Sequence, residues 1–339
     1  MNVQKLRSAL LAVLCVGCGQ VADSSGLSSS DRGGAELGSS SAGAGGDGAD
    51  LLTAGAWDDN RNYALFEEFL QRYVGLALPF SMEEHDAAFE RAEERLRARE
   101  TLDIALVVDA TGSMSDELSF LQTELEAVAT RVSEAYPEAD ARWALIMYRD
   151  QGDEYVTRIF DFDDLDAVRE RLARQRAGGG GDYPEASARA LQRMNRLEWR
   201  RDRDTARLAF WLADAPHHDA QSDRFADAIR WAAEQDIHLY PVASSGIDER
   251  TEVAMRSSAQ LTAGRYLFLT DDSGVGDSHR EPTVPCYFVT TLTRTMIRMV
   301  DIEMSGAYVE PPADHIIRTG GDPTSGACQL ADGDEAYVW

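Results

Sequence analysis

The chain has 339 residues, in which 33 lysines and arginines stand against 59 aspartates and glutamates, for a formal net charge of −26. So acidic a chain repels polyanions, which excludes nucleic acid and anionic lipid surfaces as partners bound through charge. The length exceeds the needs of one compact core, and the composition changes sharply near residue 56. We therefore expect five segments, at 1–17, 18–56, 57–100, 101–306 and 307–339.

Residues 1–17 have the pattern of a bacterial secretory signal peptide. Lys5 and Arg7 precede the apolar run 9–14, which is too short to span a bilayer. Cys18 follows a glycine after this run, an arrangement that resembles the lipobox of bacterial lipoproteins, although Cys15 stands where leucine is usual. The resemblance implies a lipid on Cys18, with ordinary cleavage elsewhere as the alternative. Either way we expect export to the cell envelope, facing the periplasm or the cell surface. With Cys18 lipidated, the lipid anchor would be the only membrane contact.

Residues 18–56 are predicted to form a disordered tether. From residue 22 to residue 56 the chain is dominated by Ser, Gly, Ala and Asp and has no aromatic residue, so it cannot bury enough apolar surface to become ordered. Such a coil would hold the folded part on the order of 30 Å from its anchor. Export also leaves Cys286 and Cys328 in an oxidising compartment, where they form either one disulfide or two unpaired buried thiols.

Residues 57–100 are predicted to be helical. One apolar stripe and then a second follow each other at helical spacing, and Pro79 separates them. Ser81, followed by two glutamates, is a plausible start of the second helix. We expect a helical hairpin packed against the main domain, with a partner-binding coiled coil as the alternative. The stripes are Phe66, Phe69, Leu70 and Tyr73, then Met82, Phe89 and Leu96.

Residues 101–306 alternate between strand and helix patterns. Strands are expected at 102–108, 143–148, 155–160, 208–213, 237–242 and 266–269. Helices are expected at 118–132, 164–175, 184–197, 223–235 and 249–262. A last helix is expected within 287–305, where Val289, Leu292, Met296 and Met299 recur at helical spacing. This alternation predicts an α/β fold, a doubly wound, Rossmann-like and mostly parallel sheet whose ligands lie beyond the carboxyl ends of the strands. Residues 307–339 are expected to be irregular.

The stretch LDIALVVDATGSM, residues 102–114, places one carboxylate and two hydroxyls in a turn after an apolar strand. Asp109, Thr111 and Ser113 alternate, so their oxygens can face one small volume, as a hard cation such as Mg²⁺ requires. Asp214 follows the strand 208–213, whose carboxyl end lies at the same edge of a parallel sheet. The alternative is a polar turn in which these side chains only cap backbone groups.

The sequence DATGSM, residues 109–114, resembles the first motif of a von Willebrand factor A domain, and GGGGDYPE (178–185) and LADAPH (212–217) continue the likeness. The resemblance runs from about 102 to 306 and implies a metal-ion-dependent adhesion site (MIDAS) and an antiparallel edge strand at 155–160. In this family the second loop usually supplies a threonine. Here Asp182 best matches that position and Asp214 the third ligand, while the alternative for residues 178–181 is merely an unusual backbone path into a helix.

The resemblance implies Mg²⁺ as the bound metal, with Mn²⁺ or Ca²⁺ as alternatives. Gly112 lies within the expected metal loop, and the resemblance implies that Arg149 and Asp150 orient this loop through a charge pair. The alternative for Asp150 is a surface position. His217 and His218 are expected at the rim, because a hard oxygen site has little use for imidazole.

The expected function is a protein-binding module rather than an enzyme. An Asp or Glu of a protein partner would complete the coordination of the metal. The sequence contains no G-x-S-x-G, phosphate-loop or H-E-x-x-H motif. The alternatives are a metal-dependent hydrolase of a phosphate or ester, with Asp182 or Asp214 as base, and a structural scaffold without adhesive activity.

Overall fold

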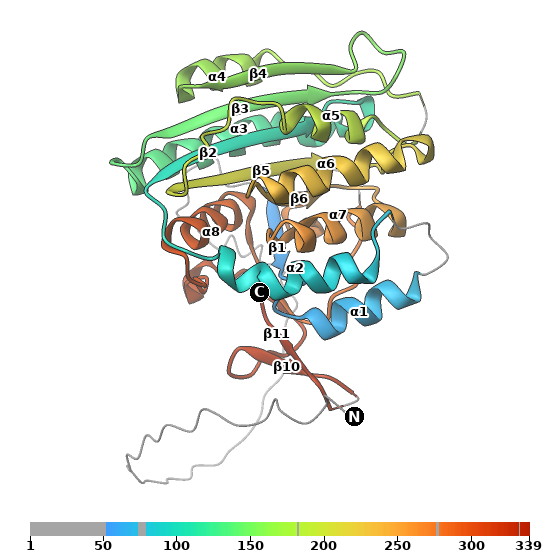
Figure 1. Ribbon diagram of the computed structural model, residues 1–339, viewed down its shortest axis with the longest axis vertical. Coiled ribbons are helices and arrows are strands. Elements are labelled where there is room, and N and C mark those ends of the chain that lie inside the picture. The colour runs from blue at the N-terminus through green and yellow to red at the C-terminus, as the bar shows by residue number, and fades with distance from the viewer. Residues whose placement is uncertain (1–51, 74–78, 182, 276–277, 332) are drawn as a thin grey trace, which may run out of the picture. The chain divides into compact units, whose positions relative to one another are not determined.

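A nine-stranded sheet forms the centre of the chain, in the order β4-β3-β2-β5-β6-β7-β1-β8-β9 (Figure 1). The computed structural model describes residues 52–73, 79–181, 183–275, 278–331 and 333–339, all within one unit. The predicted signal peptide, Cys18, most of the predicted tether and Asp182 lie outside the described residues.

Five neighbouring strands of the sheet are parallel, which confirms the predicted α/β class. They are β3 (Ala141–Tyr148), β2 (Thr101–Asp109), β5 (Thr205–Ala213), β6 (His238–Ala243) and β7 (Tyr266–Thr270). The pairs β2–β3, β2–β5, β5–β6 and β6–β7 are all parallel. At one edge β4 (Thr157–Asp163) pairs antiparallel with β3, as the resemblance implied.

The other side of the sheet differs from the prediction of a single antiparallel strand. There β1 (Thr53–Trp57) lies antiparallel between β7 and β8 (Tyr287–Thr291), and β9 (Arg318–Gly320) pairs antiparallel with β8. The predicted tether to residue 56 therefore extended too far, because its last residues form a buried strand. Gly55 is required there, since a Cβ would lie 2.3 Å from the ring of Phe268.

Two of the C-terminal predictions are also corrected. The predicted helix within 287–305 begins only at Leu292, where Thr291 caps it, so Val289 belongs to β8. The tail is not wholly irregular, since it contributes β9 and the hairpin of β10 (Ala327–Gln329) and β11 (Glu335–Tyr337). A disulfide joins Cys286 to Cys328, with 5.9 Å between their Cα atoms. This bond ties the hairpin to the residue that precedes β8.

Helices cover both faces of the sheet (Figure 1). The helices α3 (Ser115–Ala135), α4 (Leu165–Ala173) and α8 (Leu292–Ser305) bury their apolar residues in one core. The helices α5 (Ser187–Met194), α6 (Ser222–Glu234) and α7 (Glu249–Leu261) bury theirs in the core on the other face. None of the described helices has the length and apolar character that a membrane span needs.

The N-terminal extension contains two helices, α1 (Tyr63–Arg72) and α2 (Met82–Arg95). Ser81 and Glu84 form a capping box at the start of α2, as the sequence suggested for Ser81. The rings of Tyr63 and Phe89 stack with centroids 4.3 Å apart, which joins the two helices. The side chains of His85 and Gln260 lie 2.6 Å apart and link α2 to α7.

Glu303, on α8, lies in a buried polar cluster against the sheet. Its carboxylate is 2.8 Å from His238 Nδ1 and accepts a hydrogen bond of 2.9 Å from Arg265. The hydroxyl of Tyr240 also donates to it. Burial alone would raise the pKa of Glu303, but the positive charges of His238 and Arg265 outweigh burial and hold the pKa at about 2.

We expect the protein to lose stability as the pH falls from about 4.5 toward about 2. A carboxyl group whose folded pKa is depressed stabilises the fold above its unfolded pKa, and this contribution disappears as the pH falls through the folded pKa. For Glu303 it is on the order of 3 kcal/mol. Urea unfolding at several pH values measures it. Glu303→Gln should flatten the acid slope and the exposed control Glu134→Gln should not; an equal slope in all three proteins would contradict the assignment.

Candidate functional site

The candidate site begins where β2 ends. The apolar side chains of β2 are buried on both faces, and the strand delivers Asp109 to the edge of the sheet with no exposed surface. Asp109 Oδ1 accepts hydrogen bonds from the backbone N–H of Thr111 at 2.9 Å and from its hydroxyl at 2.7 Å. The hydroxyl of Ser113 lies 3.2 Å from that of Thr111. The structure thus brings the three oxygen-bearing side chains of the first motif together.

Asp214 reaches the same place from the neighbouring strand. Because β2 and β5 are parallel and in register, with Val108 opposite Leu212, their carboxyl ends lie side by side. Asp214 is buried, and its carboxylate accepts a hydrogen bond from Ser113. Two strands and one turn therefore place two carboxylates and two hydroxyls in one small volume.

Several carboxylate oxygens at this site have no hydrogen-bond partner. Among the described residues, Asp109 Oδ2, Asp214 Oδ1, Glu185 Oε2 and Glu117 Oε2 are buried and unpartnered. A buried acceptor without a donor is costly, and a buried negative charge is costlier still. The unpartnered oxygens fit a bound cation, because a cation would satisfy buried acceptors that no donor reaches.

The acidic side chains at the site also disfavour one another's charge. Burial raises the pKa of Asp109, and the negative charge of Asp214 raises it further. Burial likewise raises the pKa of Asp214, with Glu117 adding to the shift. Burial raises the pKa of Glu185 to about 9, helped by nearby carboxylates, Asp109 first among them. Each group would regain its charge beside a cation.

The glycine loop packs directly on the first motif. Gly178 N–H donates to Ala110 O and Gly112 N–H to Gly179 O, both at 3.0 Å. Gly179 and Gly180 have φ of 79° and 71°, a conformation that favours glycine. A Cβ on Gly180 would lie 3.0 Å from both Thr111 and Glu185. The loop therefore needs glycine so that it can approach the first motif closely. This agrees with the alternative of an unusual backbone path into a helix. It does not exclude a ligand role for Asp182, which lies outside the described residues.

Glu185 is a further residue of the site, one for which the sequence alone indicates no role. Its backbone N–H donates to Pro216 O at 2.9 Å, and residue 185 forms a parallel bridge with residue 217. This bridge brings its carboxylate to the rim of the glycine loop. The only sequence signal was its place at the end of the GGGGDYPE motif.

Arg149 and Asp150 both contact the site, but not as the predicted charge pair. Arg149 donates to Ala110 O at 3.1 Å and to Arg176 O at 2.7 Å, so it ties the first motif to the segment before the glycine loop. Asp150 Oδ1 lies instead 2.6 Å from His218 Nε2. Arg149 therefore contacts the first motif through the backbone carbonyl of Ala110.

The two histidines after Asp214 differ from each other. His218 is partly exposed beside Asp150, as predicted for a rim residue. His217 is buried and stacks on Phe225 with ring centroids 4.1 Å apart, so its prediction as a rim residue is wrong. Burial lowers the pKa of His217 to about 4, so the ring is neutral and packs as an aromatic side chain.

The donor set consists of hard oxygens. Within the described ranges, no three His, Cys, Asp or Glu side chains gather as a metal-binding group. The site instead combines the carboxylates of Asp109 and Asp214 with the hydroxyls of Thr111 and Ser113. Such oxygens suit Mg²⁺ better than a softer metal.

Residues 103–275 match the family model of the von Willebrand factor A domain. The chain belongs to the von Willebrand factor A domain family. The matched segment includes the four oxygen donors described above and the position of Asp182. The whole N-terminal extension and the whole C-terminal hairpin lie outside the segment matched to the von Willebrand factor A domain.

Two curated proteins share sequence with this chain. The chain is 30% identical over 190 residues to the putative ariadne-like RING finger protein R811 of Acanthamoeba polyphaga mimivirus, covering 50% of this chain and 18% of that protein. It is 26% identical over 136 residues to the alpha-protein kinase vwkA of Dictyostelium discoideum, covering 39% of this chain and 21% of that protein. The chain thus spans about a fifth of the length of these relatives.

Among solved structures, the von Willebrand factor A domain is similar to two crystal structures of the pilus adhesin SpaC from Lactobacillus rhamnosus GG. For the open conformation the TM-score is 0.39 at 12% identity, with 49% of this chain and 27% of the adhesin covered. For the second crystal form the TM-score is 0.38 at 13% identity, with 49% and 28% covered.

Proposed function

We propose that this von Willebrand factor A domain binds a divalent cation and uses it to capture a protein partner. Asp109, Thr111, Ser113 and Asp214 would hold the ion, with Asp182 as a further ligand, and Mg²⁺ is the first choice ahead of Mn²⁺ or Ca²⁺. The observation that carries the proposal is the pair of buried, unpartnered carboxylate oxygens on Asp109 and Asp214 beside two hydroxyls.

Electrostatics supports a cation at this place. Taking a charged carboxylate out of water costs several kcal/mol. None of the described ion pairs joins an arginine to Asp109 or Asp214, since Arg142 pairs with Asp103 and Arg149 with Glu154. A divalent ion would neutralise both carboxylates. The hydroxyls of Thr111 and Ser113 are uncharged, so the ion would keep affinity for a further anionic ligand.

The fold family suggests what that ligand is, because von Willebrand factor A domains often mediate protein interactions. An Asp or Glu side chain of a protein partner would complete the coordination. With a net charge of −26, this chain would repel an acidic partner everywhere except at the cation. Tyr183, whose side chain is 49% exposed beside the glycine loop, would offer an aromatic contact at the rim. The proposed role is therefore binding rather than catalysis.

A pull-down from envelope extract tests metal-dependent capture. With Mg²⁺ present we expect the chain to retain a partner that EDTA releases and that excess Mn²⁺ restores. Asp109→Ala should lose this partner. The matched control is Asp140→Asn, because Asp140 is exposed and lies before β3, at the opposite edge of the sheet.

The outcomes separate the proposed role from its alternatives. A partner retained equally in EDTA and by Asp109→Ala would overturn metal-bridged adhesion. Metal uptake without any metal-dependent partner would favour the scaffold. Release of phosphate or alcohol from model esters, abolished by Asp109→Ala, would favour the hydrolase.

We further propose that the chain is exported and anchored to a membrane by a lipid on Cys18. The support is the charged and apolar sequence of residues 1–17, followed by a cysteine. Cells fed radiolabelled palmitate should incorporate label into the wild-type protein and none into Cys18→Ser. Equal labelling of both proteins would refute the anchor.

A further inference from the structure

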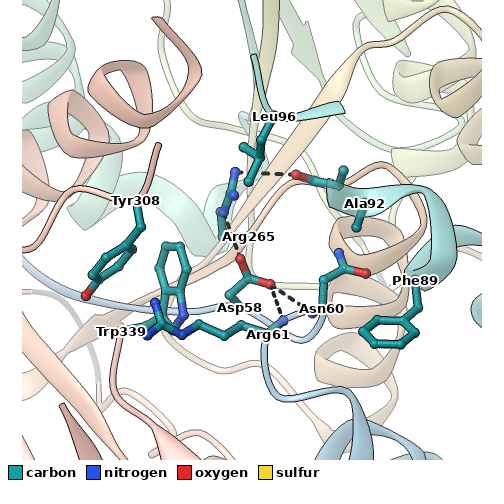
Figure 2. Close-up of a pocket in the computed structure, with 10 residues that line it drawn as sticks. Asp58, Asn60, Arg61, Phe89, Ala92, Leu96, Arg265, Tyr308 and Trp339 are labelled. Carbon is teal, nitrogen blue, oxygen red and sulfur yellow. Dashed lines mark hydrogen bonds and ion pairs between the residues drawn. The ribbon is translucent and has the colours of Figure 1, made fainter. Parts of the chain in front are cut away.

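A cavity of 210 Å³ lies where the N-terminal extension meets the C-terminal segment (Figure 2). Its lining includes Asp58, Arg61, Phe89, Leu96, Tyr308 and Trp339, and all its lining residues except Ala263 and Arg265 fall outside the segment 103–275 that matches the family. The family's shared fold therefore does not account for this cavity.

The cavity is remote from the proposed metal centre. Arg265 comes immediately before β7, at the amino end of that strand, whereas Asp109 and Asp214 lie at the carboxyl ends of β2 and β5. Because these strands are parallel, the cavity and the metal centre lie at opposite edges of the sheet. A ligand in the cavity would not contact the metal.

Asp58, the acidic residue in the cavity lining, already has hydrogen-bond partners for both of its carboxylate oxygens. Asp58 Oδ1 accepts from the backbone N–H groups of Asn60 and Arg61 at 2.8 and 3.0 Å. Its Oδ2 accepts from Arg265 Nε at 3.0 Å, as Figure 2 shows. The negative charge of Asp58 is thus balanced by the ion pair with Arg265 and by hydrogen bonds from its own loop.

Arg61, in contrast, forms no ion pair with any described carboxylate. Its guanidinium lies 4.6 Å from the ring centroid of Tyr308, 5.0 Å from that of Tyr337 and 5.9 Å from that of Trp339. These rings hold the guanidinium in place without neutralising it. Figure 2 shows the side chain of Arg61 extended beneath Trp339.

A second arginine without an ion pair lies behind the aromatic wall. The described chain contains six buried arginines, and a carboxylate pairs with five of them, Arg99, Arg149, Arg207, Arg256 and Arg265. The sixth, Arg298, has no such pair among described residues and lies 5.2 Å from the ring of Trp339 and 5.4 Å from that of Tyr308. Its Nη2 and the indole Nε1 of Trp339 are buried donors without an acceptor.

The groups left without partners around the cavity are therefore cations and donors, and its walls are aromatic and aliphatic. From this juxtaposition we infer that the cavity binds a small carboxylate with a flat apolar body. The body would pack against the apolar lining that includes Phe89, Ala92 and Leu96. The carboxylate would pair with Arg61, which the rings of Tyr308 and Trp339 hold in place. The volume admits a ligand of roughly ten non-hydrogen atoms, since drug-sized ligands fill roughly 300–1,000 Å³.

Isothermal titration calorimetry of the whole protein in EDTA tests this inference with three probes. Phenylacetate has the expected size and charge, phenylacetamide is its neutral counterpart, and inorganic phosphate is an anion without an apolar body. We expect phenylacetate to bind and phenylacetamide to bind at least about tenfold more weakly. Because EDTA removes divalent cations, the result does not depend on the proposed metal centre.

Three variants locate the site. Arg61→Gln should weaken phenylacetate binding at least about tenfold, and Ala92→Leu, which fills the cavity and leaves every charge in place, should abolish it. Arg72→Gln is the matched control, because Arg72 is an exposed arginine of the neighbouring α1, and its binding should be unchanged. Arg61 is exposed, so its variant should keep the fold even if Ala92→Leu does not.

Three results would overturn the inference. The first is no detectable heat with phenylacetate. The second is equal affinity for phenylacetamide, which would make the cavity a simple apolar pocket. The third is phosphate binding as tight as that of phenylacetate and unaffected by Ala92→Leu, which would indicate only a surface anion contact.

Discussion

Replacing Asp109 with asparagine should abolish stabilisation by Mg²⁺ while leaving the metal-free protein at least as stable as the wild type. The physical reason is that Asp109 is buried, has one unpartnered oxygen and lies beside the carboxylate of Asp214. Without a cation its negative charge costs stability, so a neutral side chain of the same shape relieves the repulsion. With a cation the same charge provides binding energy.

Thermal unfolding with and without Mg²⁺ measures both effects. At a concentration one hundred times its dissociation constant, the ion should stabilise the wild type by about 2.7 kcal/mol and Asp109→Asn by nearly nothing. The matched control is Asp103→Asn, because Asp103 is equally buried in the same strand but accepts two hydrogen bonds from Arg142 at 2.9 and 2.7 Å.

The control variant Asp103→Asn should differ from Asp109→Asn both in its metal-free stability and in its response to Mg²⁺. Asp103→Asn should lose stability in both conditions and keep its response to Mg²⁺. An Asp109→Asn protein that responds to Mg²⁺ like the wild type would remove Asp109 from the proposed ligand set.

Replacing Arg256 with methionine should destabilise the protein by about 3–5 kcal/mol, the usual cost of breaking a buried ion pair. Arg256 donates to both oxygens of Asp59, at 2.6 and 3.1 Å, and its Nη1 lies 3.3 Å from Glu252. Its guanidinium also packs 3.7 Å from the ring centroid of Phe69. Removing it leaves the buried carboxylate of Asp59 without its cation and leaves Glu252 with only the more distant Arg280, whose Nε lies 3.8 Å away.

Chemical unfolding of the single and double variants checks this expectation. Asp59→Asn combined with Arg256→Met removes the stranded charge of Asp59, so the double variant should be more stable than Arg256→Met alone. A loss below about 1 kcal/mol in Arg256→Met would mean that the N-terminal extension, to which Asp59 belongs, contributes little to the fold of the domain.

The parallel half of the sheet could be predicted because its strands carry continuous apolar runs between amphipathic helices. The strand β1 could not, because its Thr-Ala-Gly-Ala-Trp sequence continues the small-residue composition before it. Gly55 of this strand is required by the close approach of the Phe268 ring, which belongs to a residue more than two hundred positions away in sequence. In β8, Val289 stands three residues before Leu292, so a strand and the following helix together imitated one helical stripe.

The convergence of Asp109 and Asp214 could be predicted for a related reason. Parallel neighbouring strands have their carboxyl ends at one edge, so a polar residue after each strand suffices to locate the site. Glu117 and Glu185 could not be found in this way. Their approach depends on how α3 packs and on the bridge from Glu185 to residue 217, which are tertiary contacts without a local sequence pattern.

The position of β1 between β7 and β8 determines when the sheet can be completed. Thr53 pairs with Thr270 across 217 residues of chain, so a ribosome must produce most of the domain before this early segment meets either neighbour. Contacts so distant in sequence form slowly, because a long loop has to close first. Until then the edges of β7 and β8 lack a partner between them. The first segment of the folded domain to be synthesised is therefore among the last to be incorporated.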